Sequence, residues 1–117
     1  MRLLVIEDDP DLNRQLATAL TDAGYVVDRA FDGEEGHYLG ETEPYDAVIL
    51  DIGLPKMDGY AVARAIRLRR DYRPRLIALT GYGLPEDQSK ALQAGFDAHL
   101  AKPADLARLA VLLSAET

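Results

Sequence analysis

Short apolar runs alternate along the chain with longer stretches in which apolar residues recur every three or four positions. A continuous apolar run is typical of a strand that is covered on both faces, and the longer spacing is typical of an amphipathic helix. We therefore predict five strands, at residues 3–6, 25–27, 47–50, 76–79 and 98–101. Five helices are predicted around residues 12–23, 34–39, 61–66, 86–94 and 106–113.

The residues at the ends of these stretches support the same boundaries. Asp9 and Pro10 are an N-cap and a first-turn proline, and Asp58 can cap the third helix. Gly24 and Gly95 follow two helices, where glycine commonly ends a helix. Strands that alternate with helices form a parallel sheet covered on both faces. The predicted fold class is α/β, a flavodoxin-like doubly wound five-stranded parallel sheet with five helices, for which we choose the strand order 2-1-3-4-5.

The composition fits a single domain spanning residues 1–117. The 117 residues can bury a core without disulfides, and the absence of cysteine excludes thiolate sites. No apolar stretch is long enough for a signal peptide or a transmembrane helix, so we expect a cytoplasmic protein with no membrane partner. The net charge of −7 disfavours direct nucleic-acid binding. We interpret the one basic cluster as a solvated helix face; it consists of Arg64, Arg67, Arg69 and Arg70.

Polar residues follow four of the predicted strands: Glu7, Asp8 and Asp9, then Asp51, Thr80 and Lys102. Because the carboxyl ends of parallel strands meet at one edge of a sheet, we expect these side chains to share a small cleft. Carboxylates this close repel one another unless a cation or protons intervene, and a hard cation such as Mg²⁺ prefers oxygen ligands. An acidic Mg²⁺ pocket with a lysine and a hydroxyl suits phosphoryl transfer, and a carboxylate can itself accept the group.

These residues and the loop after Asp51 carry a family resemblance. The pieces occur in order: Glu7-Asp8, Asp51 with Leu54-Pro55-Lys56-Met57-Asp58-Gly59, Leu79-Thr80 and Lys102-Pro103. Together they resemble the bacterial response-regulator receiver family, over residues 2 to about 114. The resemblance implies the phosphoacceptor domain of a two-component phosphorelay, in which a kinase phosphohistidine gives its phosphoryl group to an aspartate in a Mg²⁺-dependent reaction.

The resemblance assigns roles to the first group of matching positions. Asp51 would be the phosphoacceptor, Asp8 a direct metal ligand, and Glu7 a ligand that acts through water. The backbone carbonyl of Gly53 would complete the metal site. Asp9 lies one residue past the acidic pair, so we give it the role of helix N-cap.

The remaining positions would act on the phosphorylated product. Thr80 would hydrogen-bond the phosphoryl group and change position on activation, and Lys102 would pair with the phosphoaspartate. Pro103 resembles a cis-proline that shapes this loop. Two roles stay open for His99, an inward-turning switch residue or a half-exposed strand histidine. Two also stay open for Tyr82, a partial cover over the site or an ordinary loop aromatic.

The resemblance is uneven along the chain. The first sixty residues look like the winged-helix transcription-factor branch, often called the OmpR/PhoB type, whereas residues 79–100 resemble receivers of hybrid histidine kinases. The last helix is nearly apolar, and Ala98 stands where that branch has an interface acid. We therefore expect a monomer or a weak homodimer. A chimeric or engineered receiver, joined near residues 60–75, is a further hypothesis.

The implied partners are a histidine kinase or a histidine phosphotransfer domain, and an effector domain or downstream protein. We expect no effector domain within this chain, and no enzyme activity beyond self-catalysed phosphorylation and dephosphorylation. An inert receiver scaffold, acting only through protein contacts, is the main alternative. A phosphatase with an aspartate nucleophile would need a second Asp where Gly53 stands. An FMN binder would need a phosphate loop in place of the acids at residues 7–9.

Overall fold

The computed structural model describes residues 1–54, 56–69, 74–81, 85–102 and 105–114. Within these residues, parallel strands form one sheet in the predicted order β2-β1-β3-β4-β5. The strands are β1 (Arg2–Ile6), β2 (Val26–Ala30), β3 (Ala47–Asp51), β4 (Arg75–Thr80) and β5 (Ala98–Ala101). The helices between and after them are α1 (Pro10–Asp22), α2 (Gly33–Thr42), α3 (Gly59–Arg67), α4 (Pro85–Ala94) and α5 (Leu106–Ser114).

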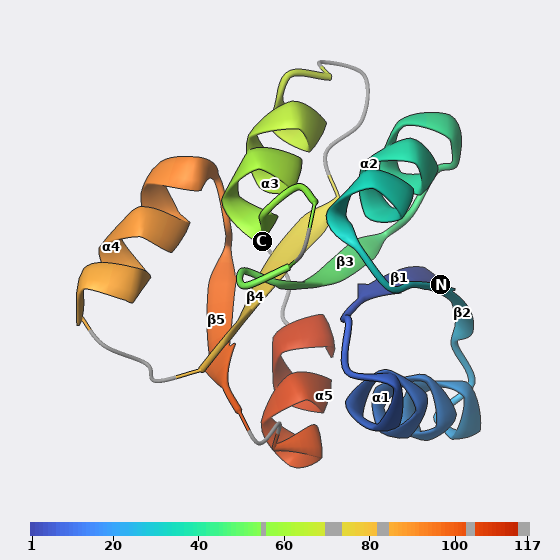
Figure 1. Ribbon diagram of the computed structural model, residues 1–117. Coiled ribbons are helices and arrows are strands. Elements are labelled where there is room, and N and C mark those ends of the chain that lie inside the picture. Colours follow the sequence, from blue (N-terminus) through green and yellow to red (C-terminus); the bar gives the residue numbers. More distant parts are fainter. Residues whose placement is uncertain (55, 70–73, 82–84, 103–104, 115–117) are drawn as a thin grey trace.

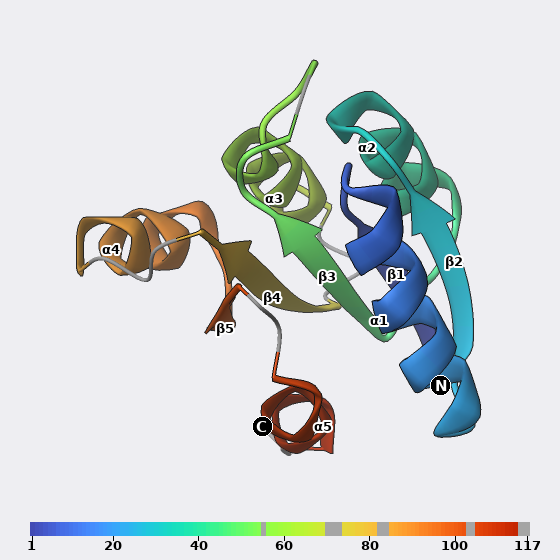
Figure 2. The ribbon, with the colours of Figure 1, turned by 60° about the horizontal axis from the view of Figure 1, so that its bottom comes forward.

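Helices cover both faces of the sheet. Figure 1 shows α1 and α5 on one face and α2, α3 and α4 on the other. In Figure 2 the same molecule is turned, with α1 crossing in front of β1 and α5 lying below β5. Among the helices in the described residues, none is long and apolar enough to cross a membrane.

The central strands supply both halves of the core, which explains their unbroken apolar runs. Leu4 and Ile6 of β1 belong to the half of the core that α2, α3 and α4 cover, whereas Leu3 and Val5 belong to the half that α1 and α5 cover. All four side chains are fully buried. A strand whose two faces are both covered loses the alternation of polar and apolar residues, as the sequence pattern predicted.

The second strand is longer than the sequence pattern predicted. It covers Val26–Ala30 instead of residues 25–27. β2 lies at the edge of the sheet, where polar residues are common. The side-chain partners of its Asp28 could not be recognised from the sequence pattern. The Asp28 carboxylate accepts hydrogen bonds from the Tyr45 hydroxyl at 2.7 Å and from Arg2 Nη2 at 2.8 Å.

Aspartates cap three of the helices. As predicted, Asp9 and Asp58 accept hydrogen bonds from first-turn amides of α1 and α3, at 3.0 Å and 2.9 Å. Asp32 caps α2 in the same way at 2.8 Å, so α2 begins before its predicted start. At the other end of α1, Gly24 has a φ of +98°, a left-handed conformation that glycine adopts without steric cost. These caps fix the directions in which the helices leave the sheet.

The start of α3 packs directly against the end of β3. Gly59 is buried, and its amide donates to the Ile52 carbonyl at 3.2 Å. A Cβ at residue 59 would lie 2.4 Å from the Asp51 carbonyl oxygen and 2.5 Å from Ile52 Cα. Because only glycine permits this approach, Gly59 helps to fix the backbone that carries Asp51.

We expect Gly59→Ala to destabilise the protein by about 1–3 kcal/mol, because the added Cβ would force α3 away from β3. Urea unfolding followed by circular dichroism measures this loss as a lower midpoint. Gly81→Ala is the control, since no described atom lies within 4 Å of a Cβ at that position. Equal midpoints for the two variants would contradict the close packing of α3 on β3.

Candidate functional site

The carboxyl ends of the strands bring together the polar residues that the sequence analysis singled out. In the sheet register, Asp51 at the end of β3 pairs with Leu79 of β4. Thr80 at the end of β4 pairs with Ala101 of β5, immediately before Lys102. Glu7 follows the last residue of β1, which is the other neighbour of β3. Residues that are far apart in the sequence therefore share one end of the sheet.

The Lys102 ammonium links two of the acids. Its Nζ lies 2.8 Å from Glu7 Oε1 and donates to Asp51 Oδ2 at 2.9 Å. The Lys102 amide also donates to the Thr80 carbonyl at 2.8 Å, which holds the end of β5 beside β4. Partial burial works to lower the pKa of Lys102, but its contacts with the two carboxylates outweigh that effect and raise the pKa above its ordinary value. Lys102 therefore stays charged.

Three carboxylates converge on this point. Oxygen atoms of Glu7, Asp8 and Asp51 lie within 4.8 Å of one another. Glu7 and Asp51 are buried, whereas Asp8 is exposed, so the cluster opens to solvent at Asp8. With all three ionised, Lys102 offsets one of their charges and a charge of −2 remains. An oxygen-only cluster with this residual charge fits a hard divalent cation such as Mg²⁺.

Glu7 has the most perturbed acidity in the cluster. Burial raises the pKa of Glu7 to about 7. The Asp9 amide, which donates to Glu7 Oε2 at 2.9 Å, and the Lys102 ammonium both work to lower this pKa. The neighbouring Asp8 and Asp51 raise it further. The side chain is fully buried, so loss of solvation prevails and Glu7 exchanges a proton near neutral pH.

A buried amide that the sequence analysis missed holds Glu7 in place. Asn13 is fully buried in α1, and its Nδ2 donates to the carbonyls of Glu7 at 2.9 Å and Ala30 at 3.0 Å. Arg29 Nε donates in turn to Asn13 Oδ1 at 2.6 Å. These bonds tie the ends of β1 and β2 together. The available signal was a polar residue on the buried stripe of α1, three positions before Leu16.

The loop after β3 returns to the Asp51 carboxylate. The Gly53 amide donates to Asp51 Oδ1 at 2.9 Å, so the two carboxylate oxygens have different partners. A Cβ at residue 53 would lie 3.7 Å from Asp51 Oδ1, an ordinary contact distance. Farther along, Lys56 has a φ of +69°, uncommon for a residue other than glycine, and its Nζ lies 3.5 Å from Asp32 Oδ2. The metal-binding role of the Gly53 carbonyl stays a prediction.

The Thr80 hydroxyl lies at the end of the strand next to Asp51. It is fully buried, and Oγ1 has no hydrogen-bond partner among the residues described. Buried hydroxyls are normally hydrogen-bonded, because losing water without replacement costs free energy. Oγ1 is therefore a donor available to an oxygen atom of a ligand in the cleft.

The remaining predicted residues lie elsewhere. His99 is exposed on β5, where it lines a small hollow with Leu92 and Phe96 on the α4 side of the sheet. Its role as a switch residue stays a prediction. Pro103 and Tyr82 fall outside the described residues.

Comparison with known proteins decides the family. The family model named "Response regulator receiver domain" matches residues 3–114. The chain belongs to this family. Among curated proteins, this receiver domain is similar to the transcriptional regulatory protein CusR of Escherichia coli K12, with 40% identity over 109 residues. That match covers 93% of this chain and 48% of CusR, so the receiver domain spans about half the length of that relative.

Two solved structures are similar in both sequence and fold. The receiver domain of sensor histidine kinase PA1611 from Pseudomonas aeruginosa PAO1 is 36% identical, with a TM-score of 0.88, covering 96% of this chain and 93% of that one. It holds a magnesium ion in its active-site cleft. A response regulator from Burkholderia pseudomallei is 29% identical, with a TM-score of 0.86, covering 97% and 66%. It holds a phosphorylated aspartic acid, a calcium ion and citrate.

These matches bear on the uneven resemblance noted in the sequence. A transcriptional regulator and a kinase receiver each match more than nine-tenths of the chain. Receiver domains of both kinds are therefore similar to this one through residues 60–75. The hypothesis of a junction in that segment stays a prediction.

The buried Glu7 carboxyl predicts how stability depends on pH in the absence of metal. Its pKa is about 7 in the folded protein and about 4.5 when unfolded, so the folded state holds its proton more tightly between these values. Stability should therefore fall as pH rises through this window, by about 3 kcal/mol from this group. Urea unfolding at a series of pH values, with a chelator present, measures the change.

Glu7→Gln should lack this component, because a glutamine does not titrate. Glu34→Gln, on the exposed first turn of α2, is the matched control and should keep the wild-type dependence. If wild type and Glu7→Gln lost stability equally between these pH values, the pKa of Glu7 would be the same in the folded and unfolded states.

Proposed function

We propose that this receiver domain accepts a phosphoryl group on Asp51 and thereby switches the surface formed by its last helices and strand. The observation that carries the proposal is the setting of the Asp51 carboxylate. Oδ2 accepts from Lys102 and Oδ1 from Gly53, within a cluster of acids. Beside it lies the Thr80 hydroxyl, which has no hydrogen-bond partner among the described residues. A carboxylate in such a setting can act as a nucleophile toward phosphorus.

The acids of the cleft are suited to holding Mg²⁺. Asp8 and Asp51 would bind it directly, Glu7 through water, and the Gly53 carbonyl would add another oxygen. When bound, the ion offsets negative charge on the oxygens of the transferring phosphoryl group. The metal ions of the PA1611 and Burkholderia structures support this assignment, as does the oxygen-only cluster.

The reaction proposed for the chain's own residues is an in-line displacement. A kinase or a phosphotransfer domain presents its phosphohistidine over the cleft, and an Asp51 oxygen attacks the phosphorus. An O–P bond forms while the P–N bond breaks, and the electron pair stays on the imidazole nitrogen. Lys102 then pairs with one phosphoryl oxygen, and the Thr80 hydroxyl donates to another.

The same residues would catalyse phosphorylation from a small donor and the later hydrolysis. Neither reaction needs a group from the kinase, because Asp51 is the nucleophile and Lys102 and Thr80 stabilise the charge. In hydrolysis, water attacks the phosphorus and the Asp51 carboxylate leaves. Position 53 faces this path without a side chain, so a residue larger than glycine there would change the rate of hydrolysis.

The switch would be a shift between two existing conformations. Movement of Thr80 toward the phosphoryl group would favour one arrangement of α4, β5 and α5, with His99 following it. The partner that reads this surface would be an effector domain or a separate protein. We further propose that the domain works in the cytoplasm as a monomer or weak homodimer. Its net charge of −7 argues against direct contact with nucleic acid.

Incubation with acetyl phosphate should add one phosphoryl group to the wild-type protein when Mg²⁺ is present, because Asp51 is the only carboxylate in the proposed acceptor position. Intact-protein mass spectrometry measures the adduct. Asp51→Asn should show none, since an amide cannot replace the carboxylate nucleophile. Asp11→Asn, in the exposed first turn of α1, is the matched control and should react like wild type.

An adduct that formed equally in Asp51→Asn would move the acceptor to another residue. Absence of an adduct from folded wild-type protein that binds Mg²⁺ would favour an inert scaffold that acts only through protein contacts.

Lys102→Ala should slow adduct formation by about 10–100-fold, because one cation beside the phosphoryl oxygens is lost. The adduct that does form should shift the amide NMR signals of β5 and α4 less than in wild type, since the link between Asp51 and the end of β5 is missing. Lys90→Ala removes a lysine outside the cleft and should behave as wild type in both measurements. Full spectral shifts in Lys102→Ala would show that Lys102 does not couple phosphorylation to the surface.

A further inference from the structure

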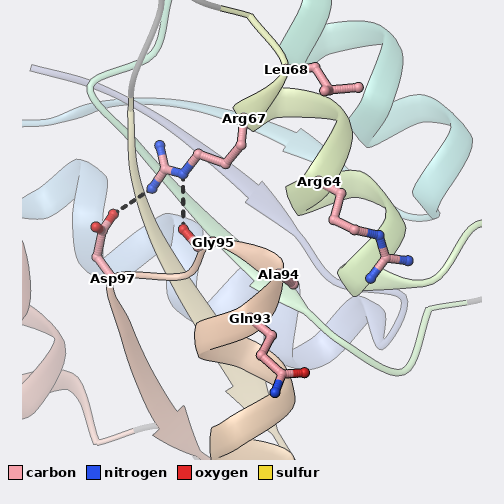
Figure 3. Close-up of a pocket in the computed structure, with 7 residues that line it drawn as sticks. All are labelled: Arg64, Arg67, Leu68, Gln93, Ala94, Gly95 and Asp97. Atoms are coloured by element: carbon pink, nitrogen blue, oxygen red, sulfur yellow. Dashed lines mark hydrogen bonds and ion pairs between the residues drawn. The ribbon is translucent and has the colours of Figure 1, made fainter.

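A groove runs between α3 and α4 (Figure 3). Its larger part has a volume of about 610 Å³, and a second part of about 330 Å³ adjoins it. The two parts share three lining residues, so they form one continuous surface, which we call the α3–α4 groove. The lining residues of the whole groove that the argument uses are Tyr60, Arg64, Leu68, Lys90, Gln93 and Ala94.

The described arginines of the basic cluster do not form the single solvated face that we expected from the sequence. Arg64 and Arg67 lie on α3 and Arg69 just after it, and Arg70 falls outside the described residues. Arg67 donates to the carbonyls of Gly95 at 2.9 Å and Pro74 at 2.8 Å, and it pairs with Asp97 at 2.7 Å. Figure 3 shows Arg67 reaching two of these partners across the end of the groove. Arg69 donates to backbone carbonyls at the end of α2. These two side chains therefore hold elements of the fold together.

Arg64 and Lys90 differ from them. Both are exposed, and neither side chain has an ion pair or a hydrogen bond with another described residue. In Figure 3, the Arg64 side chain points away from Asp97 and Gly95, the partners of Arg67, and Gln93 projects from the neighbouring helix α4. Two cations that have no side-chain partner among the described residues thus line one groove, beside the apolar surface of Leu68, which is 81% exposed.

We propose that the α3–α4 groove binds an acidic amphipathic segment of a partner protein. Carboxylates of the segment would pair with Arg64 and Lys90, and its apolar side chains would cover the exposed Leu68. Residues 60 to 68 extend about 12 Å along α3, which matches about two turns of a bound helix. A helix that lays one face into a groove between two helices is a common way for proteins to recognise peptides.

The charge of the whole chain favours this occupant over others. The net charge of −7 repels a nucleic acid or an anionic membrane, whose charge is dense and extended. A second copy of the chain carries the same net charge, which opposes self-association. A short segment with a few carboxylates and an apolar face meets less of this repulsion, and it uses both the cations and the exposed leucine.

The test uses the full chain and a synthetic peptide of about 14 residues, long enough for partial helix formation, with Leu and Glu repeating at helical spacing. Its matched peptide carries Gln at every Glu position. Binding is followed by the amide NMR spectrum of the protein and by fluorescence anisotropy of labelled peptide. The variants are Arg64→Glu and Lys90→Glu, with Arg108→Glu on α5 as a control that has the same net charge.

The acidic peptide should shift amide signals of residues 60–68 and 90–95. Each groove variant should weaken binding by about tenfold or more, whereas the control should change it little, because only local charges are fully felt in salt. The Gln peptide should bind about tenfold more weakly as well. Asp51→Asn should bind the acidic peptide as wild type does, so the groove is tested independently of phosphorylation.

Three outcomes would overturn the proposal. The first is an absence of shifts in the groove at millimolar peptide, and the second is equal weakening by Arg64→Glu and Arg108→Glu. The third is that a single-stranded DNA oligonucleotide, or a second copy of the chain detected by sedimentation, occupies the groove in place of the peptide.

Discussion

Three carboxylates with oxygens within 4.8 Å of one another need positive charge close by, because two of them are buried. Lys102 supplies part of it, with Nζ 2.8 Å from Glu7 and 2.9 Å from Asp51. The acids come from the first half of the chain and the ammonium from its end. The remaining negative charge suits a divalent cation. Without one, the same charge would repel the phosphoryl group that the domain is proposed to accept.

The rest of the fold serves to hold these groups together. Parallel strands place Asp51 beside the ends of β1 and β4, and the short distance between Gly59 and the Asp51 backbone fixes the start of α3 there. The Asn13 amide donates to the carbonyls of Glu7 and Ala30 and so links the end of β1 to the end of β2. The Gly53 amide orients one Asp51 oxygen and leaves the other to Lys102. Each contact joins a residue of the site to a different element, so the cleft depends on the assembled sheet.

The elements, their order and the convergence of the site residues could be predicted from sequence, because buried parallel strands have unbroken apolar runs and chemistry gathers at their carboxyl ends. Pairings across the fold could not. β2 extends past its apolar residues, pairing with β1 along its whole length, and its Asp28 is bonded by Tyr45 and Arg2. From the sequence we interpreted Arg67 as part of a solvated helix face, yet its guanidinium donates to two backbone carbonyls and pairs with Asp97. Such roles depend on residues that only folding brings near.

The basic side chains of this acidic protein fall into two groups, according to whether they have partners within the described part of the fold. Lys102 and Arg67 are fully engaged by carboxylates or carbonyls, so replacing either would leave buried or part-buried groups unpaired. Arg64 and Lys90 are exposed and pair with none of the described residues, and an exposed ion pair of either would add little to stability. Their positions across one groove, in a chain of net charge −7, are then better explained by a ligand than by stability. Arg64 and Lys90 can therefore change with little effect on the stability of the fold, and they lie where they can determine which partner binds.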